Sequence, residues 1–155
     1  CDQNFTKSFE WYEKGAKLGH SRAMLNVGIC YKDGKGVTKD LNKAKEWYTK
    51  GAEQGHSSSM SNLGYCYEKG FGCDENKTKA FEWYEKSAKL GNSSAMYNVG
   101  ICYKNGRGVT KDLNKAIEWY TKAMENDEEF SFLKTTLDAL IVAQQEANNN
   151  DDDEL

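Results

Sequence analysis

Apolar side chains recur along the chain at the three- and four-residue spacing that places them on one face of an α-helix. Two neighbouring segments follow this spacing, through Ala23, Val27, Gly28 and Tyr31 in residues 21–33 and through Ala44, Trp47, Tyr48 and Ala52 in residues 41–54. Gly34 and Gly36 lie between them, and glycine accepts the positive φ angle found just past a helix end. Asp40 stands where its side chain can cap the second helix. The pattern predicts a helical hairpin.

This hairpin pattern recurs every 36 residues. The interval is marked by Trp11, Trp47, Trp83 and Trp119, by the expected N-caps Asn4, Asp40, Asn76 and Asp112, and by the expected helix stops Gly34, Gly70 and Gly106. A step of 72 residues is stronger still, because residues 21–50 and 93–122 differ at only five of 30 positions. Such a period is typical of a solenoid in which each unit packs on its neighbours. We therefore predict an all-α solenoid of tandem helix-turn-helix repeats.

We expect one solenoid domain over residues 1–147 and a disordered acidic tail over 148–155. The expected parts of the domain are a leading half repeat, three full repeats and a C-terminal capping helix, over residues 1–20, 21–56, 57–92, 93–127 and 128–147. The capping helix is predicted because an open solenoid exposes its last apolar face, and because an apolar stripe recurs at helical spacing in Phe130, Leu133, Leu137, Leu140 and Ile141. The tail is too polar to bury anything.

The fixed positions of the repeat resemble those of the Sel-1-like repeat family. They are Ala23, Val27-Gly28, Tyr31, Gly34-x-Gly36-Val37, Asp40, Lys43-Ala44, Trp47-Tyr48, Lys50 and Gly55, with their counterparts as far as about residue 127. The resemblance implies a tetratricopeptide-like α/α solenoid, a right-handed superhelix that serves as a protein-interaction scaffold or adaptor. Residues 1–19 match residues 73–91 at 15 of 19 positions, so the chain opens inside a repeat. We expect the first helix to pack poorly on its N-terminal side.

Composition and spacing give little sign of chemistry. The 24 acidic and 21 basic residues are dispersed and give a net charge of −3, with no basic stripe for nucleic acid and no apolar run for membrane insertion. Each Gly-x-Gly triplet follows a helix C-terminus, where the helix dipole disfavours anions. Cys30, Cys66 and Cys102 occupy one repeat position on successive helices, too far apart for disulfides. We expect reduced cysteines, no metal, no cofactor and no enzyme activity, because an active site would break the periodicity.

A protein or peptide partner is expected on the concave side, which the first helices of the units line. The candidate contacts are the side chains off the packing stripe, namely Arg22, Leu25, Asn26, Ile29, Asn62, Tyr65, Lys69, Tyr97, Asn98 and Ile101. The asparagines allow two interpretations. Their amides bind a peptide backbone, or they bond within their own or an adjacent helix.

Two other interpretations remain beside that of a cytoplasmic adaptor. A scaffold of the secretory pathway or endoplasmic reticulum is indicated by the final Asp152-Asp153-Glu154-Leu155 and by the glycosylation patterns Asn4-Phe5-Thr6, Asn76-Lys77-Thr78 and Asn92-Ser93-Ser94. A self-assembling structural protein would form homo-oligomers through a terminal repeat or the C-terminal helix.

Overall fold

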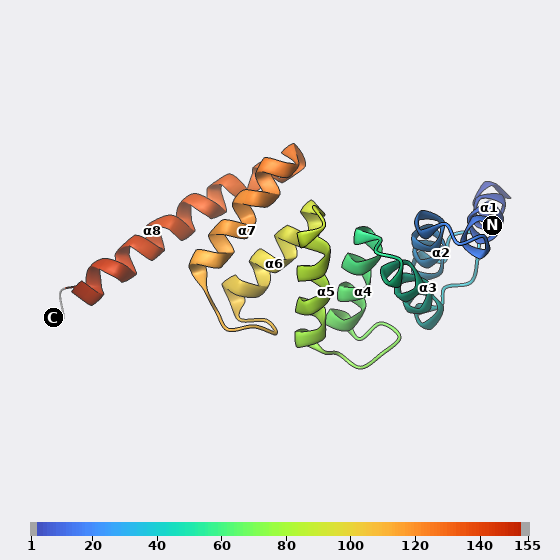
Figure 1. Ribbon diagram of the computed structural model, residues 1–155, viewed down its shortest axis with the longest axis horizontal. Coiled ribbons are helices and arrows are strands. Elements are labelled where there is room, and N and C mark those ends of the chain that lie inside the picture. The colour runs from blue at the N-terminus through green and yellow to red at the C-terminus, as the bar shows by residue number, and fades with distance from the viewer. Residues whose placement is uncertain (1–2, 153–155) are drawn as a thin grey trace.

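The computed structural model describes residues 3–152 and folds them into an elongated row of helices (Figure 1). The helices are α1 (Gln3–Lys17), α2 (Ser21–Asp33), α3 (Leu41–Glu53), α4 (Ser57–Lys69), α5 (Lys77–Lys89), α6 (Ser93–Asn105), α7 (Leu113–Asn126), the 3-10 helix η1 (Glu128–Phe132) and α8 (Leu133–Asp152). We call α2, α4 and α6 the A helices, and α1, α3, α5 and α7 the B helices. The predicted all-α solenoid is confirmed.

The hairpin boundaries follow the predicted caps. Gly34, Gly70 and Gly106 end the A helices with φ angles of 73°, 67° and 66°. Each B helix that follows begins after a side-chain cap, in which Asp40, Asn76 and Asp112 accept hydrogen bonds of 3.0, 2.8 and 3.0 Å from backbone N–H groups. The prediction for Asn4 is wrong, because α1 already begins at Gln3 and includes Asn4 in its first turn.

Within each hairpin, a tyrosine ring of the B helix packs on a glycine of the A helix. Tyr84 is 1% exposed, and a Cβ atom added to Gly64 would lie 2.8 Å from its Cδ1 atom. Tyr48 lies on Gly28 and Tyr120 on Gly100 in the same way. Because only glycine leaves room for the ring, this contact fixes the close approach of the two helices.

Consecutive repeats are held in register by the second glycine of each A–B turn. A Cβ atom added to Gly72 would lie 2.7 Å from the backbone oxygen of Leu41, at the start of the preceding B helix. Gly36 approaches Phe5 and Gly108 approaches Lys77 in the same manner. Each turn is therefore seated on the first turn of the B helix before it.

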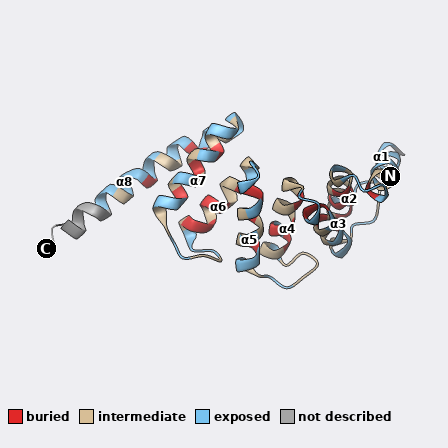
Figure 2. Cartoon of the chain, viewed as in Figure 1, coloured by how far each residue is buried: buried red, intermediate tan, exposed pale blue. Residues whose placement is uncertain are grey.

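The A helices form the inner side of the solenoid. α2 contacts α4 and α4 contacts α6, whereas the B helices within residues 3–152 make no comparable contacts with one another. The buried side chains run along the row of helices (Figure 2). They form two core clusters, and the partly buried Tyr67 packs against both. The apolar spine is therefore continuous from repeat to repeat.

The two ends of the row differ. Trp11 on α1 is 71% exposed, whereas Trp47, Trp83 and Trp119 are half-buried against the core clusters. This contrast agrees with the expected poor packing of the first helix on its N-terminal side. At the other end, α8 packs on α7 and buries Leu133 and Leu140.

The C-terminal helix departs from the prediction in two respects. Ile141, assigned to the apolar stripe, is 38% exposed, whereas Leu133 and Leu140 are buried. The helix also continues to Asp152, although disorder was expected from residue 148, and no glycine or proline interrupts it. Residues 153–155, and with them most of the Asp152–Leu155 motif, lie outside the described residues. None of the helices of residues 3–152 is long and apolar enough to cross a membrane.

Candidate functional site

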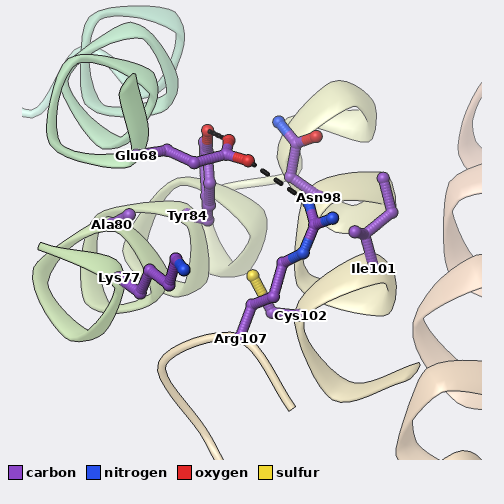
Figure 3. A pocket seen from close by; sticks show the side chains of 8 residues that line it. All are labelled: Glu68, Lys77, Ala80, Tyr84, Asn98, Ile101, Cys102 and Arg107. Carbon is purple, nitrogen blue, oxygen red and sulfur yellow. Dashed lines mark hydrogen bonds and ion pairs between the residues drawn. The ribbon is translucent and has the colours of Figure 1, made fainter. Parts of the chain in front are cut away.

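Two pockets lie where a B helix meets the A helix of the next repeat. The α5–α6 pocket has a volume of about 50 Å³ and is lined by Glu68, Lys77, Ala80, Tyr84, Asn98, Ile101, Cys102 and Arg107 (Figure 3). The α1–α2 pocket has a volume of about 220 Å³ and is lined by Phe5, Ser8, Tyr12, Asn26, Ile29, Cys30 and Lys35. The structure thus brings four of the ten predicted contact residues, Asn26, Ile29, Asn98 and Ile101, to two pockets on the inner side.

Glu68 is the centre of a polar network in the α5–α6 pocket. Its Oε2 atom accepts a hydrogen bond of 2.8 Å from the Tyr84 hydroxyl. Its Oε1 atom lies 3.5 Å from Nη1 of Arg107 and 3.6 Å from Nζ of Lys69. Figure 3 shows the guanidinium group of Arg107 directed toward the Glu68 carboxylate, with the Asn98 side chain beside it. A wider cavity of about 300 Å³ adjoins the pocket and shares Glu68, Lys77 and Arg107 with it.

The buried hydroxyl and thiol groups of this pocket stay protonated at neutral pH. Burial, and then the hydrogen bond to Glu68, raise the pKa of Tyr84 above its ordinary value of 10.0. Burial raises the pKa of Cys102 to about 11. A neutral, buried thiol is a weak nucleophile. Within the described residues no group of three His, Cys, Asp or Glu side chains is placed to hold a metal ion. The arrangement offers hydrogen bonds and charge to a bound molecule.

The three equivalent asparagines of the A helices have different surroundings. Asn62 donates a hydrogen bond of 2.9 Å from Nδ2 to the backbone oxygen of Ser58, in its own helix. Asn26 and Asn98 make no side-chain hydrogen bond within residues 3–152, and each lines a pocket. Asn62 therefore bonds within its own helix, whereas the amides of Asn26 and Asn98 remain available to a ligand.

An aromatic pair occupies the middle repeat at the positions that Ile101 and Arg107 hold in the next one. Tyr65 and Phe71 meet edge to face, with ring centroids 5.6 Å apart. Tyr65 is 37% exposed, and the ammonium group of Lys69 lies 5.8 Å from its ring centroid. The middle of the inner side is therefore more apolar than the two pockets.

The remaining predicted contact residues lie outside the pockets. Leu25 is half-buried against the core, and Arg22 is exposed beside His56, whose pKa its charge helps to lower. Tyr97 packs against Phe130 and Phe132 of η1, with ring centroids 5.7 and 5.9 Å apart. The capping segment therefore already covers part of the Tyr97 ring.

Sequence reasoning missed the pocket residues that do not belong to an A helix. Lys35 and Arg107 come from A–B turns, while Tyr12, Lys77 and Tyr84 come from the preceding B helix. One feature of the sequence indicated the two cations. Lys35 and Arg107 are 72 residues apart and preserve a cation, whereas the repeat between them has Phe71 at that position.

The stacked hairpins, glycine-seated tyrosines and inner row of A helices define an α/α solenoid of the kind that carries binding surfaces on its inner side. The Sel1 repeat model matches residues 1–20, 21–56, 57–92 and 93–127. The chain therefore belongs to the Sel1 repeat family. These matched ranges coincide with the repeat boundaries predicted from the 36-residue period.

Solved structures of similar proteins support this assignment. A Sel1 repeat protein from Oxalobacter formigenes is 33% identical with a TM-score of 0.75, over 81% of this chain and 51% of that protein. The protective antigen c5321 of uropathogenic Escherichia coli, which has an SLR fold, is 34% identical with a TM-score of 0.73, over 78% of this chain and 26% of that protein. The cysteine-rich protein B of Helicobacter pylori shares the fold, with a TM-score of 0.66 and 21% identity over 84% of this chain and 94% of its own.

Among curated proteins, the chain is similar to the DAP3-binding cell death enhancer 1 of Rattus norvegicus and of Mus musculus. Each is 40% identical over 40 residues, which is 26% of this chain. The chain spans 8% of the length of these relatives.

Proposed function

We propose that this chain is a non-catalytic protein-interaction module that holds a peptide segment of a partner on the inner side of the solenoid. The proposal rests above all on the amides of Asn26 and Asn98, which line pockets there without a hydrogen-bond partner in the described chain. An amide offers a donor and an acceptor, which is what an extended peptide backbone requires. The name of the curated relatives records that they bind another protein, which agrees with this role.

The experiment that tests this function starts from a random peptide library displayed on phage and selected on the full chain. The affinities of the selected peptides are then measured by fluorescence anisotropy. We expect Asn26→Ala and Asn98→Ala each to weaken binding about fivefold, as expected for one lost hydrogen bond worth about 1 kcal/mol. Asn114→Ala is the matched control, since Asn114 is exposed on α7 and lines neither pocket.

The location of the bound peptides provides a second measurement. In NMR spectra of the ¹⁵N-labelled protein, we expect peptide-induced shifts in α2, α4 and α6. Selected peptides that shift only the outer B-helix residues, with affinities insensitive to both asparagine substitutions, would rule out the inner side as the binding surface.

Self-association is a second candidate function, and the exposure of Trp11 favours it. Three aromatic side chains of α1 are exposed, Phe5 at 47%, Trp11 at 71% and Tyr12 at 37%, and a group of exposed apolar side chains is typical of an interaction surface. We expect a mass that rises with protein concentration in sedimentation experiments and that Trp11→Gln returns to one chain. Leu90→Gln is the control, because Leu90 is also exposed, at 56%, but lies in a turn between repeats. A constant monomer mass would remove this candidate.

A further inference from the structure

The two inner pockets are copies of one site, separated by two repeats. Each of the seven residues that line the α1–α2 pocket lies 72 residues before a residue of the α5–α6 pocket. Five positions keep the same kind of side chain in both copies, as the pairs Tyr12 and Tyr84, Asn26 and Asn98, Ile29 and Ile101, Cys30 and Cys102, and Lys35 and Arg107. Each copy thus offers an amide, a branched apolar side chain and a cation.

The charges of the two copies are also alike. In the α5–α6 pocket the Glu68 carboxylate lies within 4 Å of two cations, Lys69 at 3.6 Å and Arg107 at 3.5 Å. Beside the α1–α2 pocket Asp33 stands between two cations in the same way, with Lys32 and Lys35 each at 3.3 Å. Because one carboxylate is shared by two cations, each site keeps an excess of one positive charge.

The excess cations are accessible to a ligand. The side chains of Lys35 and Arg107 are 54% and 50% exposed. Ion pairs with this much exposure contribute little free energy and are readily exchanged for other partners. An incoming carboxylate would accept hydrogen bonds from the cation and from the free amide of the same site, and its methylene groups would contact the isoleucine.

Between the two sites the inner side is apolar. Phe71 stands at the position of Lys35 and Arg107, and Tyr65 stands at the position of the two isoleucines. The rings contact each other, and Tyr65 remains 37% exposed. A side chain that lies here would be apolar, because it would meet two rings while the Asn62 amide is committed to Ser58. The nearby ammonium group of Lys69 is paired with Glu68.

We propose that the two inner pockets bind two acidic side chains of one partner segment, and that the Tyr65–Phe71 pair between them holds an apolar side chain of the same segment. This inference rests on the proposed function and specifies its partner as an acidic–apolar–acidic peptide. Binding at both pockets by one segment makes the second contact intramolecular, which increases the affinity without new kinds of contact.

The test uses synthetic fluorescein-labelled peptides that carry two glutamates with a leucine midway between them. The number of glycine and serine residues between the glutamates is varied, and affinities for the full chain are measured by anisotropy. We expect one range of spacings to bind at least about tenfold more tightly than the same peptide with one glutamate replaced by glutamine. Peptides with lysine in place of both glutamates should not bind measurably.

Substitutions in the protein test which residues bind the two glutamates. At the best spacing we expect Lys35→Gln and Arg107→Gln each to weaken binding about tenfold, and Arg107→Lys to retain it. Lys134→Gln removes an equal charge from the exposed face of α8 and should leave the affinity unchanged. Circular dichroism spectra of the variants check that each keeps its helical fold.

The outcomes separate this inference from the proposed function. Library-selected peptides that depend on Asn26 and Asn98 but are not acidic, or that ignore Lys35 and Arg107, would overturn the acidic partner and leave the interaction module intact. A spacing series in which two glutamates bind no better than one would overturn the paired sites. Absence of any peptide that depends on the inner side would overturn the proposed function itself.

Discussion

The first and second full repeats bury the same tyrosine in different polar surroundings. Tyr48 and Tyr84 are each 1% exposed and rest on equivalent glycines. The Tyr84 hydroxyl donates to Glu68, whereas the Tyr48 hydroxyl is buried with no partner in the part of the chain that the structure describes. Lys32 occupies the position of Glu68 in the first repeat, and an ammonium group cannot accept a hydrogen bond from the hydroxyl. Equivalent shape therefore does not imply equivalent stability.

The comparison also relates stability to binding. The carboxylate that satisfies Tyr84 is the one that lies beside Arg107 in the α5–α6 pocket. The second repeat thus anchors its pocket to a buried core residue, whereas in the first repeat Asp33 is bonded to lysines at the surface. Repeats of one family can share their packing and differ in the polar atoms attached to it.

The largest expected effect comes from removing the same hydroxyl in the two repeats. Tyr84→Phe should lower the free energy of unfolding by about 2 kcal/mol, because it removes a hydrogen bond to a charged group. Tyr48→Phe should leave stability unchanged or raise it by up to about 1 kcal/mol, because it removes a buried unsatisfied group. Urea denaturation followed by circular dichroism measures both. Equal losses in the two variants would contradict the comparison.

A smaller change in stability is expected from giving the Tyr48 hydroxyl a hydrogen-bond acceptor. Lys32→Glu places a carboxylate where Glu68 stands in the second repeat, and we expect a gain of about 1 kcal/mol in unfolding free energy. The gain should be absent in a Tyr48→Phe background, which makes a double-mutant cycle the decisive measurement. Lys32→Met controls for loss of the ion pair with Asp33. A gain that persists without the Tyr48 hydroxyl would place its origin elsewhere.

The fold was predictable because its determinants are local and periodic. Gly34 and Asp40 signal a helix end and a helix start within a few residues, and the 36-residue step repeats the signal along the chain. The candidate site was predictable only in part. The A-helix spacing found Asn98 and Ile101, but Arg107 and Tyr84 reach the same pocket from a turn and from the preceding repeat.

Differences among equivalent residues were the harder part to predict. The three A-helix asparagines occupy one repeat position, yet only Asn62 bonds within its own helix. Tyr97 has a groove position in the sequence pattern, but Phe130 of η1 packs on it from beyond the last repeat. Side-chain rotation and contacts across repeats decide these cases, and periodicity alone does not specify them.

The smallest change in stability is expected at the two junctions that begin and end the second repeat, where His56 and Asn92 cap the helices that follow. His56 caps α4, accepting a hydrogen bond of 3.3 Å at Nδ1 from the backbone N–H of Ser59, whose Oγ atom lies 3.1 Å from the same nitrogen. Asn92 caps α6 at the equivalent position. Burial, followed by the charge of Arg22, lowers the pKa of His56 below its ordinary value of 6.5.

A lowered pKa in the folded state makes the His56 junction sensitive to acid. Below a pH of about 6.5 the unfolded chain takes up a proton before the folded chain does, so stability is fully present above that pH and is lost as the pH falls toward the folded pKa. We expect His56→Asn, which substitutes the cap found at Asn92, to flatten the stability profile as the pH falls below about 6.5. Urea midpoints across that range measure the slope, and His20 is present in both proteins. If the two profiles are parallel, protonation of His56 does not weaken this junction, and the two junctions of the repeat respond alike to acid.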